Sequence, residues 1–443
     1  ILSAIVPMFN DMTGKQIVLN PLDNGFIVLA FLFITFFVGV LAGTYPAFFL
    51  SGFQPTLVLK GKFISNAKGQ LLRKGLVVFQ FAIAFVIMVG TYIVYEQLDY
   101  MMSKDMGFDR EQVMVIQMPR DSVGDLTIKT EITRLAGVQS VTRFVEMPGR
   151  MVRTSTVWYE GVENNVPENL YLFSGDHDLL KTLDMKLKTG SYFDVNTQQF
   201  YKEFVINETA LKHFGWKMEE AVGKLMDIGG RSEEPGRVIG VVEDFHFKHL
   251  HDQIDPLVMY LEPNFEGRFM AIKIKSDNLK GQISSIERTW KTLLPQYEFE
   301  YVFLDETFDK LFDEEKKLGQ LFSIFSGLAV FISCLGLFGL ASFTLEQSRK
   351  SVAVRKVLGA TVVGIVLMMS RDFLKLVFLG MLIAAPVAYF SMNKWLEGFA
   401  YNVGFVWMVF LYAGMVGVLV AFGTVSYHSL KAAISNPVDS LKE

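Results

Sequence analysis

The chain is poor in cysteine. Its 443 residues include one cysteine, Cys334, which lies inside a long apolar run. A disulfide within the chain and a metal cluster held by several cysteines are therefore excluded. The formal net charge of −4 is small for this length, so the overall charge gives no reason to expect a nucleic-acid partner. The first residues also lack the basic, apolar and small-residue order of a signal peptide.

Motifs that mark catalytic and nucleotide-binding sites are missing as well. No G-x-x-x-x-G-K-[ST] segment is present, and no Ser–His–Asp or Cys–His set is suggested by local context. Charges are nearly absent from the apolar runs, which leaves little for a proton relay. The segment HFKHLHDQID contains His246, His249 and His251, but their spacing is not that of a zinc site, and packing in a loop is the favoured interpretation. We expect no catalytic residue, metal site or bound cofactor in this chain.

Long hydrophobic runs, by contrast, are abundant. A helix needs roughly 20 mostly apolar residues to cross the hydrocarbon core of a bilayer. Five stretches meet this requirement, at about 25–50, 75–95, 318–343, 374–391 and 404–426. Such runs are hard to place in a water-soluble domain, so we expect five membrane spans. The mixed-polarity region between the second and third runs is long enough to form a folded domain outside the membrane.

Lysine and arginine are concentrated in two connections between these runs. The connection after the first run is basic and has no acid between Leu50 and Lys74. The stretch SRKSVAVRKVLGAT, residues 348–361, follows the third run and contains four cations and no acid. Because short basic loops stay in the cytoplasm, both connections and the C-terminus are expected inside. The N-terminal segment, the large polar region and the short loop WLEGFAY are then outside.

A short internal repeat relates the first and last apolar runs. Two motifs with the same spacing follow these runs: Tyr45, Pro55, Leu59 and Lys60, and then Tyr427, Pro437, Leu441 and Lys442. Together with the matching topology, they suggest a parallel repeat. Residues from Lys74 onward contain one complete unit, and residues 1–74 supply only the tail of an earlier one. We expect a longer parent chain with about eight spans and two outer domains.

Two strand–helix–strand patterns bracket the polar region. The first is QVMVIQM, DLTIKTEITRLAG and VQSVTRFV, and the second is FMAIKIK, LKGQISSIERTWKTLLP and YEFEYVFL. Two such units packed together make a ferredoxin-like α+β layer. The sequence from Pro148 to Pro263 is then an insertion, which we expect to be rich in β-strands. The stretch 306–343 has helical spacing and no Pro or Gly before Gly319, so a single long helix is predicted to lead into the third span.

The basic stretch 348–361 is also the most specific motif. Its residues VRKVLGA, preceded by GLFGLASFTLEQ and followed by RDFLKLVFLGMLIAAPVAYFSMNKWLEGFAY, resemble the cytoplasmic motif of MacB/FtsX-type ABC permeases. The closing NPVDSLK and the phrases VINETALKHFGW, VIGVVEDFHF and FLDETFDKLF are similar to the double-module permeases of Bacteroidota. One departure is Ser351, where many relatives have Glu. The resemblance covers nearly the whole chain.

The resemblance implies a domain layout and a site. Residues 1–74 would be the tail of a first permease module, 75–99 a span, 100–316 a MacB-like periplasmic domain and 317–443 an FtsX-like permease domain with three spans. A short coupling helix at about 346–361 would dock on a cytoplasmic ABC ATPase dimer. The residues implied to face the ATPase or lipid headgroups, or to allow the turn into the next helix, are Arg349, Lys350, Arg355, Lys356, Gly359 and Ala360.

The resemblance also implies a function. The chain would be a non-catalytic, multi-pass permease subunit of the bacterial inner membrane, with ATP bound and hydrolysed by the partner ATPase. Such permeases work by mechanotransmission, in which the ATPase cycle moves a periplasmic domain to export or release a peptide, lipoprotein, lipid or drug. The alternative is an ATPase-coupled regulator of a periplasmic cell-wall hydrolase that transports nothing. The implied partners are the ATPase dimer, membrane lipid and a periplasmic adaptor or hydrolase.

Overall fold

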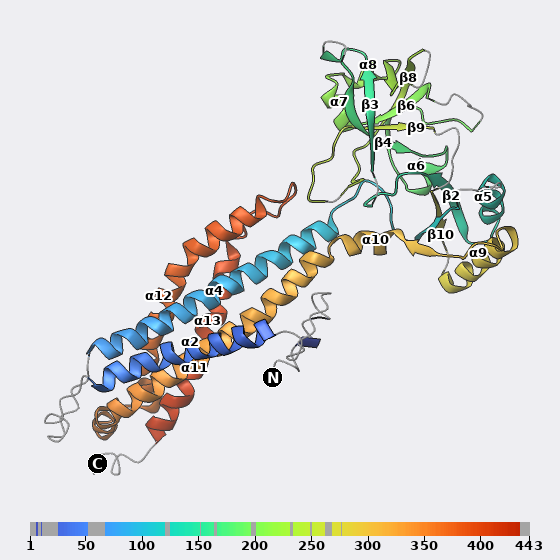
Figure 1. The fold of residues 1–443 in the computed structure, drawn as a ribbon. Helices are drawn as coiled ribbons and strands as arrows, with labels where there is room; N and C mark the ends of the chain where they lie inside the picture. Colours follow the sequence, from blue (N-terminus) through green and yellow to red (C-terminus); the bar gives the residue numbers. More distant parts are fainter. Residues whose placement is uncertain are drawn as a thin grey trace. The chain divides into compact units, whose positions relative to one another are not determined.

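The protein forms two compact units (Figure 1). The helical unit comprises Ile1–Tyr95, Glu315–Asn393 and Phe405–Glu443, and the α+β unit comprises Glu96–Glu314 and Lys394–Gly404. The α+β unit therefore includes a short second segment that comes from late in the chain. The computed structural model describes residues 6–7, 10, 25–51, 67–119, 125–150, 152–163, 166–195, 201–230, 234–248, 250–261, 268–275 and 277–434.

Long apolar helices make up the helical unit. They are α2 (Gly25–Ser51), α4 (Ala67–Ser103), α11 (Asp313–Val357), α12 (Val362–Leu396) and α13 (Met408–Ile434). Four helices in the described part of the chain, α4, α11, α12 and α13, are long and apolar enough to cross a membrane. Helix α2 coincides with the first of the five predicted spans, but its apolar stretch within the described residues, Leu29–Val40, is shorter than a span. The first span therefore stays a prediction.

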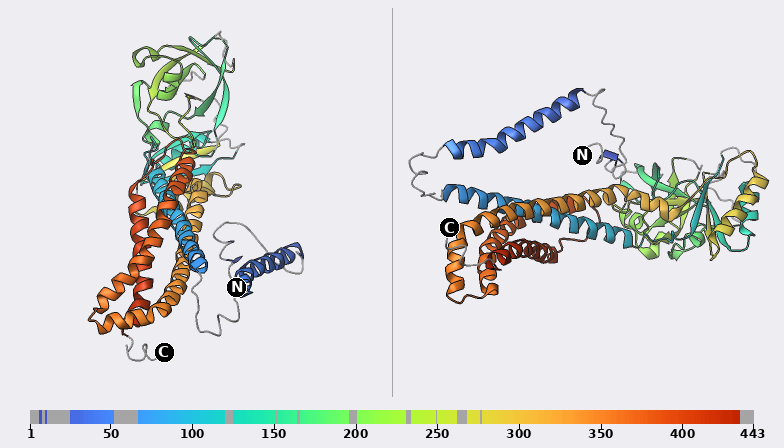
Figure 2. Two further views of the ribbon diagram at one scale, coloured as in Figure 1. Left: turned by 90° about the vertical axis from the view of Figure 1, so that its left-hand side faces the viewer. Right: turned by 90° about the horizontal axis from the view of Figure 1, so that it is seen from below.

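Glycines let these helices approach closely. A Cβ atom added at Gly380 of α12 would lie 2.8 Å from the carbonyl oxygen of Val78 in α4, and one added at Gly336 of α11 would lie 2.1 Å from Oε1 of Gln80. Helix α4 thus packs directly against both α11 and α12, and Figure 2 shows these helices side by side. Such close contact between backbones is typical of helix packing in membranes, where small residues stand at the interface.

The first layer of the α+β unit is the predicted ferredoxin-like sheet. Strands β1 (Val113–Gln117), β2 (Val138–Phe144), β10 (Phe269–Ile274) and β11 (Tyr301–Phe303) pair in the order β11-β1-β10-β2, and every pair is antiparallel. Helices α5 (Asp125–Thr133) and α9 (Leu279–Leu293) contribute buried side chains, including Ile128, Ile132, Ile286 and Trp290, to one core with the sheet. The prediction of an α+β domain with this layer is confirmed.

The insertion between β2 and β10 is rich in strands, as predicted. Its seven strands are β3 (Arg153–Tyr159), β4 (Glu168–Ser174), β5 (Leu187–Gly190), β6 (Glu203–Asn207), β7 (Leu225–Ile228), β8 (Gly236–Val242) and β9 (Leu257–Tyr260). They follow the order β5-β8-β6-β9-β4-β3-β7, and β7 also pairs with β8, so the sheet closes on itself. The short helices are α6 (Leu179–Thr182), α7 (Glu208–His213) and α8 (Met218–Ala221). Buried apolar side chains such as Phe204 and Ile206 form a core of this layer.

A buried carboxylate joins the two layers. Asp176, 2% exposed, follows strand β4 of the insertion and accepts hydrogen bonds from Lys129 Nζ at 2.7 Å, Thr142 Oγ1 at 2.6 Å and the backbone nitrogen of Arg143 at 3.0 Å. These three partners belong to α5 and β2 of the ferredoxin-like layer. A buried charge is tolerated only when its hydrogen-bonding capacity is satisfied, and Asp176 meets that condition.

The prediction of a single helix that begins at residue 306 is wrong at its N-terminal end. Helix α10 covers Leu304–Leu311, and α11 begins at Asp313 after a break at Phe312. Phe312 is 1% exposed and packs in the core of the α+β unit with Phe308, so burial of its ring fixes the break. Helix α11 continues for 45 residues, about 68 Å at 1.5 Å per residue. Helix α4 ends at Ser103.

Several sequence predictions lie outside the described residues. Of the repeat motifs, Pro55, Leu59, Lys60, Pro437, Leu441 and Lys442 fall there. The predicted repeat therefore stays a prediction.

Candidate functional site

The turn between α11 and α12 is built around Gly359. This residue has φ of 93°, a left-handed conformation that glycine adopts without strain. The backbone nitrogen of Ala360 donates to the carbonyl oxygen of Arg355 at 3.0 Å, and that of Gly359 donates to the oxygen of Lys356 at 3.1 Å. These two bonds form the Schellman motif, which satisfies the last carbonyl groups of a helix. Gly359 and Ala360, which the resemblance implies to allow the turn into the next helix, lie in this turn.

Helix α12 begins immediately after this turn. The hydroxyl oxygen of Thr361 accepts a hydrogen bond from the backbone nitrogen of Gly364 at 3.1 Å, and its carbonyl oxygen accepts one from Ile365 at 3.0 Å. Thr361 is therefore the N-cap of α12. Two consecutive caps leave only a few residues between the helices, so the turn has a defined backbone conformation. It lies at the end of the helical unit where α11 and α12 meet (Figure 2).

The predicted coupling residues are distributed over α11 and the turn. Arg349 and Lys350 belong to α11, but their side chains lie outside the described part of the structure. Arg355 is exposed, and its Nη1 lies 3.3 Å from the sulfur of Met368. Lys356 is half-buried, and Gly359 and Ala360 are exposed. Residues 346–361 do not form a short helix of their own, because residues 346–357 are the last turns of α11.

Exposed apolar side chains accompany these cations. Leu358 is 80% exposed, Val357 67% and Val363 68%. On the inner side of the same turn, Leu345, Val352, Ile365 and Met369 form a small buried cluster. The turn therefore has its own core and still presents apolar groups beside positive charge. Such a surface is suited to a membrane interface or to a partner protein.

A second candidate site is the loop between α12 and α13, which belongs to the α+β unit. Gln97 of α4 is 1% exposed, and its amide nitrogen donates to the carbonyl oxygen of Tyr401 at 2.9 Å. Its amide oxygen accepts from the backbone nitrogen of Val403 at 2.9 Å. The backbone nitrogen of Ala400 donates to the carbonyl oxygen of His251 at 2.9 Å. The loop is therefore attached to the rest of the unit by three hydrogen bonds of its own backbone.

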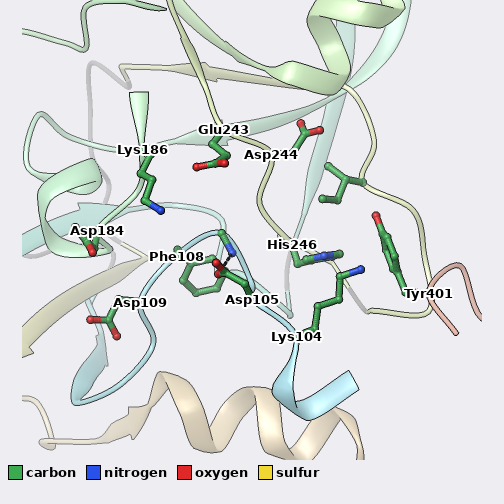
Figure 3. A pocket seen from close by; sticks show the side chains of 12 residues that line it. Lys104, Asp105, Phe108, Asp109, Asp184, Lys186, Glu243, Asp244, His246 and Tyr401 are labelled. Carbon is green, nitrogen blue, oxygen red and sulfur yellow. Dashed lines mark hydrogen bonds between the residues drawn. The ribbon is translucent and has the colours of Figure 1, made fainter. Parts of the chain in front are cut away.

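Aromatic contacts strengthen this attachment. The rings of His251 and Phe399 stack with centroids 4.4 Å apart, and those of His246 and Tyr401 meet edge to face at 5.1 Å. The ammonium group of Lys104 lies over the Tyr401 ring, 3.0 Å from its centroid (Figure 3). Burial, together with the nearby Lys104, lowers the pKa of His246 from 6.5 to about 4. Burial also lowers the pKa of Lys104.

The histidines of HFKHLHDQID thus contact the loop. His246 and His251 pack against its aromatic rings, which is the interpretation favoured from the sequence, whereas His249 lies outside the described residues. Among the residues that the structure describes, no group of three or more His, Cys, Asp or Glu side chains is arranged to hold a metal ion.

Sequence reasoning missed Gln97 and Thr361. Gln97 is one of several polar residues at the end of an amphipathic stretch, so its pattern could not single it out. Thr361 does carry a signal, because threonine directly before an apolar run is a typical N-cap. The exposed apolar residues of the turn are also visible in the sequence, since Val357 and Leu358 interrupt a basic segment.

Comparison with known proteins identifies one part of the chain. Residues 323–437 match the family model described as FtsX-like permease C-terminal. No curated protein matches the chain. Several solved structures are similar to part of it. The periplasmic region of MacB from Actinobacillus actinomycetemcomitans is 17% identical, with a TM-score of 0.35, and the match covers 47% of this chain and 97% of that one. The extracellular domain of the ABC-type transporter YknZ from Gram-positive bacteria is 16% identical, with a TM-score of 0.31, over 43% of this chain and 97% of that one.

The matched residues include the α11–α12 turn and most of α11 together with α12 and α13. The family match confirms, over residues 323–437, the resemblance to FtsX-like permeases that the sequence indicates.

Proposed function

We propose that this chain is the permease subunit of an ABC transporter that works by mechanotransmission in the bacterial inner membrane. A cytoplasmic ATPase dimer binds and hydrolyses ATP, and the chain itself is non-catalytic. The α+β unit is the periplasmic part that moves to export or release a substrate such as a peptide, lipoprotein, lipid or drug. The FtsX-like match and the four helices long enough to cross a membrane support this proposal.

The α11–α12 turn is the proposed contact with the ATPase. Arg355 and the exposed apolar residues Val357 and Leu358 offer both charge and apolar surface. The Schellman motif and the Thr361 cap give the turn a fixed backbone conformation. A fixed turn supports force transmission, because a push on it moves the ends of both helices instead of deforming a flexible loop.

The observation that carries the proposal is the attachment of the α12–α13 loop to the α+β unit. Helices α4 and α11 run from the apolar spans into the α+β unit without interruption, and the loop held by Gln97 supplies a third link. Helix α4, helix α11 and the α12–α13 loop thus each connect the apolar spans to the α+β unit. A displacement of α12 and α13 then acts on the α+β unit directly, and not only through α4 and α11.

The test is reconstitution of the full chain with its ATPase in proteoliposomes. For a transporter, ATPase activity rises when substrate is added on the face of the α+β unit, and weakening of the Gln97 link lowers this stimulation while basal hydrolysis remains. Stimulation by a periplasmic cell-wall hydrolase in place of any substrate would instead assign the regulatory function. Absence of any associated ATPase would refute both.

A further inference from the structure

A polar cavity of about 500 Å³ lies within the α+β unit (Figure 3). One wall is the segment that follows α4, between Lys104 and Asp109, and a second is formed by Asp184 and Lys186, which precede β5. The residues between β8 and His246 and the side chain of Tyr401 in the α12–α13 loop complete the lining. Pockets for small molecules typically measure about 300–1,000 Å³. The cavity is therefore large enough for a small ligand, and the function proposed above does not use it.

Close backbone contacts hold the walls of this cavity. Gly107 has φ of 78°, and a Cβ atom added there would lie 2.5 Å from the carbonyl oxygen of Asp244. The backbone nitrogen of His246 donates to the carbonyl oxygen of Met106 at 2.8 Å, and that of Asp109 donates to the oxygen of Leu183 at 2.7 Å. The segment after α4 is thus fixed against both other walls, so the cavity is formed before any ligand arrives.

Several carboxylates at the cavity already have partners. Glu243 pairs with Lys188 at 3.0 Å, and Asp109 forms an ion pair with Lys273. Asp244 accepts hydrogen bonds from the backbone nitrogen and the hydroxyl of Thr209, both at 2.8 Å. These groups are committed to the protein and contribute little free charge to a ligand.

Two opposite charges remain. Within the described residues, the ammonium group of Lys186 and the carboxylate of Asp184 make no hydrogen bond or ion pair. Asp184 has φ of 49°, a left-handed conformation that is uncommon for residues other than glycine. Figure 3 shows both side chains on one side of the cavity, with Lys104 and Tyr401 on the other. The Lys104 ammonium faces the Tyr401 ring and has no carboxylate partner there.

We propose that this cavity binds a small zwitterion, with its carboxylate at Lys186 and its ammonium group at Asp184. A simple anion would face the carboxylate of Asp184, and a simple cation would face the ammonium group of Lys186. A molecule that carries both charges meets favourable partners at each end, while the Phe108 ring and Ile254 supply apolar wall for its body.

The test is calorimetric titration of the full chain in lipid nanodiscs with triglycine. Two blocked forms serve as matched probes: N-acetyltriglycine lacks the ammonium group, and triglycine amide lacks the carboxylate. We expect triglycine to bind and each blocked form to bind at least about tenfold more weakly, since hydrogen bonds to charged groups are among the strongest. Equal binding of the acetylated form would identify an anion site, and equal binding of the amide a cation site; either result, or no binding of triglycine, overturns the proposal.

Variants separate the cavity from the rest of the surface. Asp184→Asn keeps a residue that tolerates the left-handed backbone, and both it and Lys186→Met are expected to weaken triglycine binding at least about tenfold. Lys186→Arg retains the charge and should retain binding. Lys181→Met, at the exposed end of α6, is the control and should bind as the unmodified chain does. An equal loss in the Lys181 variant, or unchanged binding in the Asp184 and Lys186 variants, contradicts the assignment.

Discussion

The side-chain amide of Gln97 forms two hydrogen bonds with the backbone around Tyr401, one to the carbonyl oxygen of that residue and one from the nitrogen of Val403, each 2.9 Å long. The two partners are separated by more than 300 positions in sequence, since the first bond joins residues 304 apart. One buried amide thus satisfies a backbone donor and a backbone acceptor of the α12–α13 loop. No other residue type has this donor and acceptor pair in the same compact geometry except asparagine, which is shorter.

Replacement of Gln97 by Ala should loosen the α12–α13 loop. Two partly buried backbone groups would lose their partners, and an unsatisfied group costs at most about 1–3 kcal/mol. We expect faster hydrogen exchange in residues 399–403 and a lower midpoint of thermal unfolding of the full chain. Gln117→Ala, which removes an exposed glutamine at the end of β1, is the matched control and should change neither. Equal exchange in both variants would show that Gln97 does not hold the loop.

The stability of the α+β unit should depend on pH through His246. Its pKa is lowered from 6.5 to about 4, so between these values the unfolded chain binds more protons than the folded one. Stability is therefore greatest above pH 6.5 and falls as the pH drops toward 4. At 1.36 kcal/mol per pKa unit, the full effect is at most about 3 kcal/mol. The groups whose charge acts on His246 are Lys104, Asp244 and Asp105.

Two variants check this dependence in thermal unfolding of the full chain between pH 7 and pH 4. His246→Gln removes the titrating group, so the loss of stability on acidification should become smaller. Lys104→Met removes a positive charge that helps to lower the pKa of His246, so this pKa should rise toward 6.5 and the loss of stability on acidification should again become smaller. A profile unchanged by His246→Gln would show that other groups control the acid sensitivity.

The ferredoxin-like layer could be predicted because its strands and helices carry local patterns. FMAIKIK has the composition of a strand, and the apolar positions Ile283, Ile286 and Trp290 repeat at helical spacing. The closure of the inserted sheet could not be predicted. It depends on pairing of β7 with β3 as well as with the next strand, β8. Strand β3 is distant in sequence, and no local pattern identifies it as a partner of β7.

The ends of the helices also differ in whether the sequence predicts them. The end of α11 at Val357 follows from Gly359, a breaker visible in the sequence. The break at Phe312 has no proline or glycine near it and arises from burial of the ring in a core that forms only in the folded unit. At the candidate site, the basic character of the turn can be read from the sequence, whereas the role of Gln97 cannot, because its partners come from a remote loop.

Gly359→Ala should weaken the turn between α11 and α12. No atom lies within 4 Å of the added Cβ, so the cost comes from the backbone at φ of 93° alone. A left-handed residue other than glycine costs about 1–2 kcal/mol. Gly327→Ala is the matched control, because this glycine is inside α11, has no contact within 4 Å and no left-handed backbone. We expect weaker association with the ATPase in co-purification for Gly359→Ala and none of this loss for Gly327→Ala.

Charge reversal at the turn is the most direct test of ATPase coupling. Arg355→Glu together with Lys356→Glu replaces two cations by two carboxylates on the last turn of α11. We expect the variant to insert into the membrane, because the apolar spans are unchanged, and to lose co-purification with the ATPase. Insertion is measured by protease added from outside to spheroplasts, which should still cut within the α+β unit and leave 348–361 intact.

The matched control reverses two exposed cations of the α+β unit. Arg288→Glu with Lys291→Glu changes the net charge of the chain by the same amount on the surface of α9. This variant should retain the ATPase, because α9 is not part of the proposed contact. If both double variants lose the ATPase, the effect is one of net charge, and if neither does, the cations of the turn serve only to hold the loop in the cytoplasm. Loss in the first variant alone assigns the contact to the α11–α12 turn.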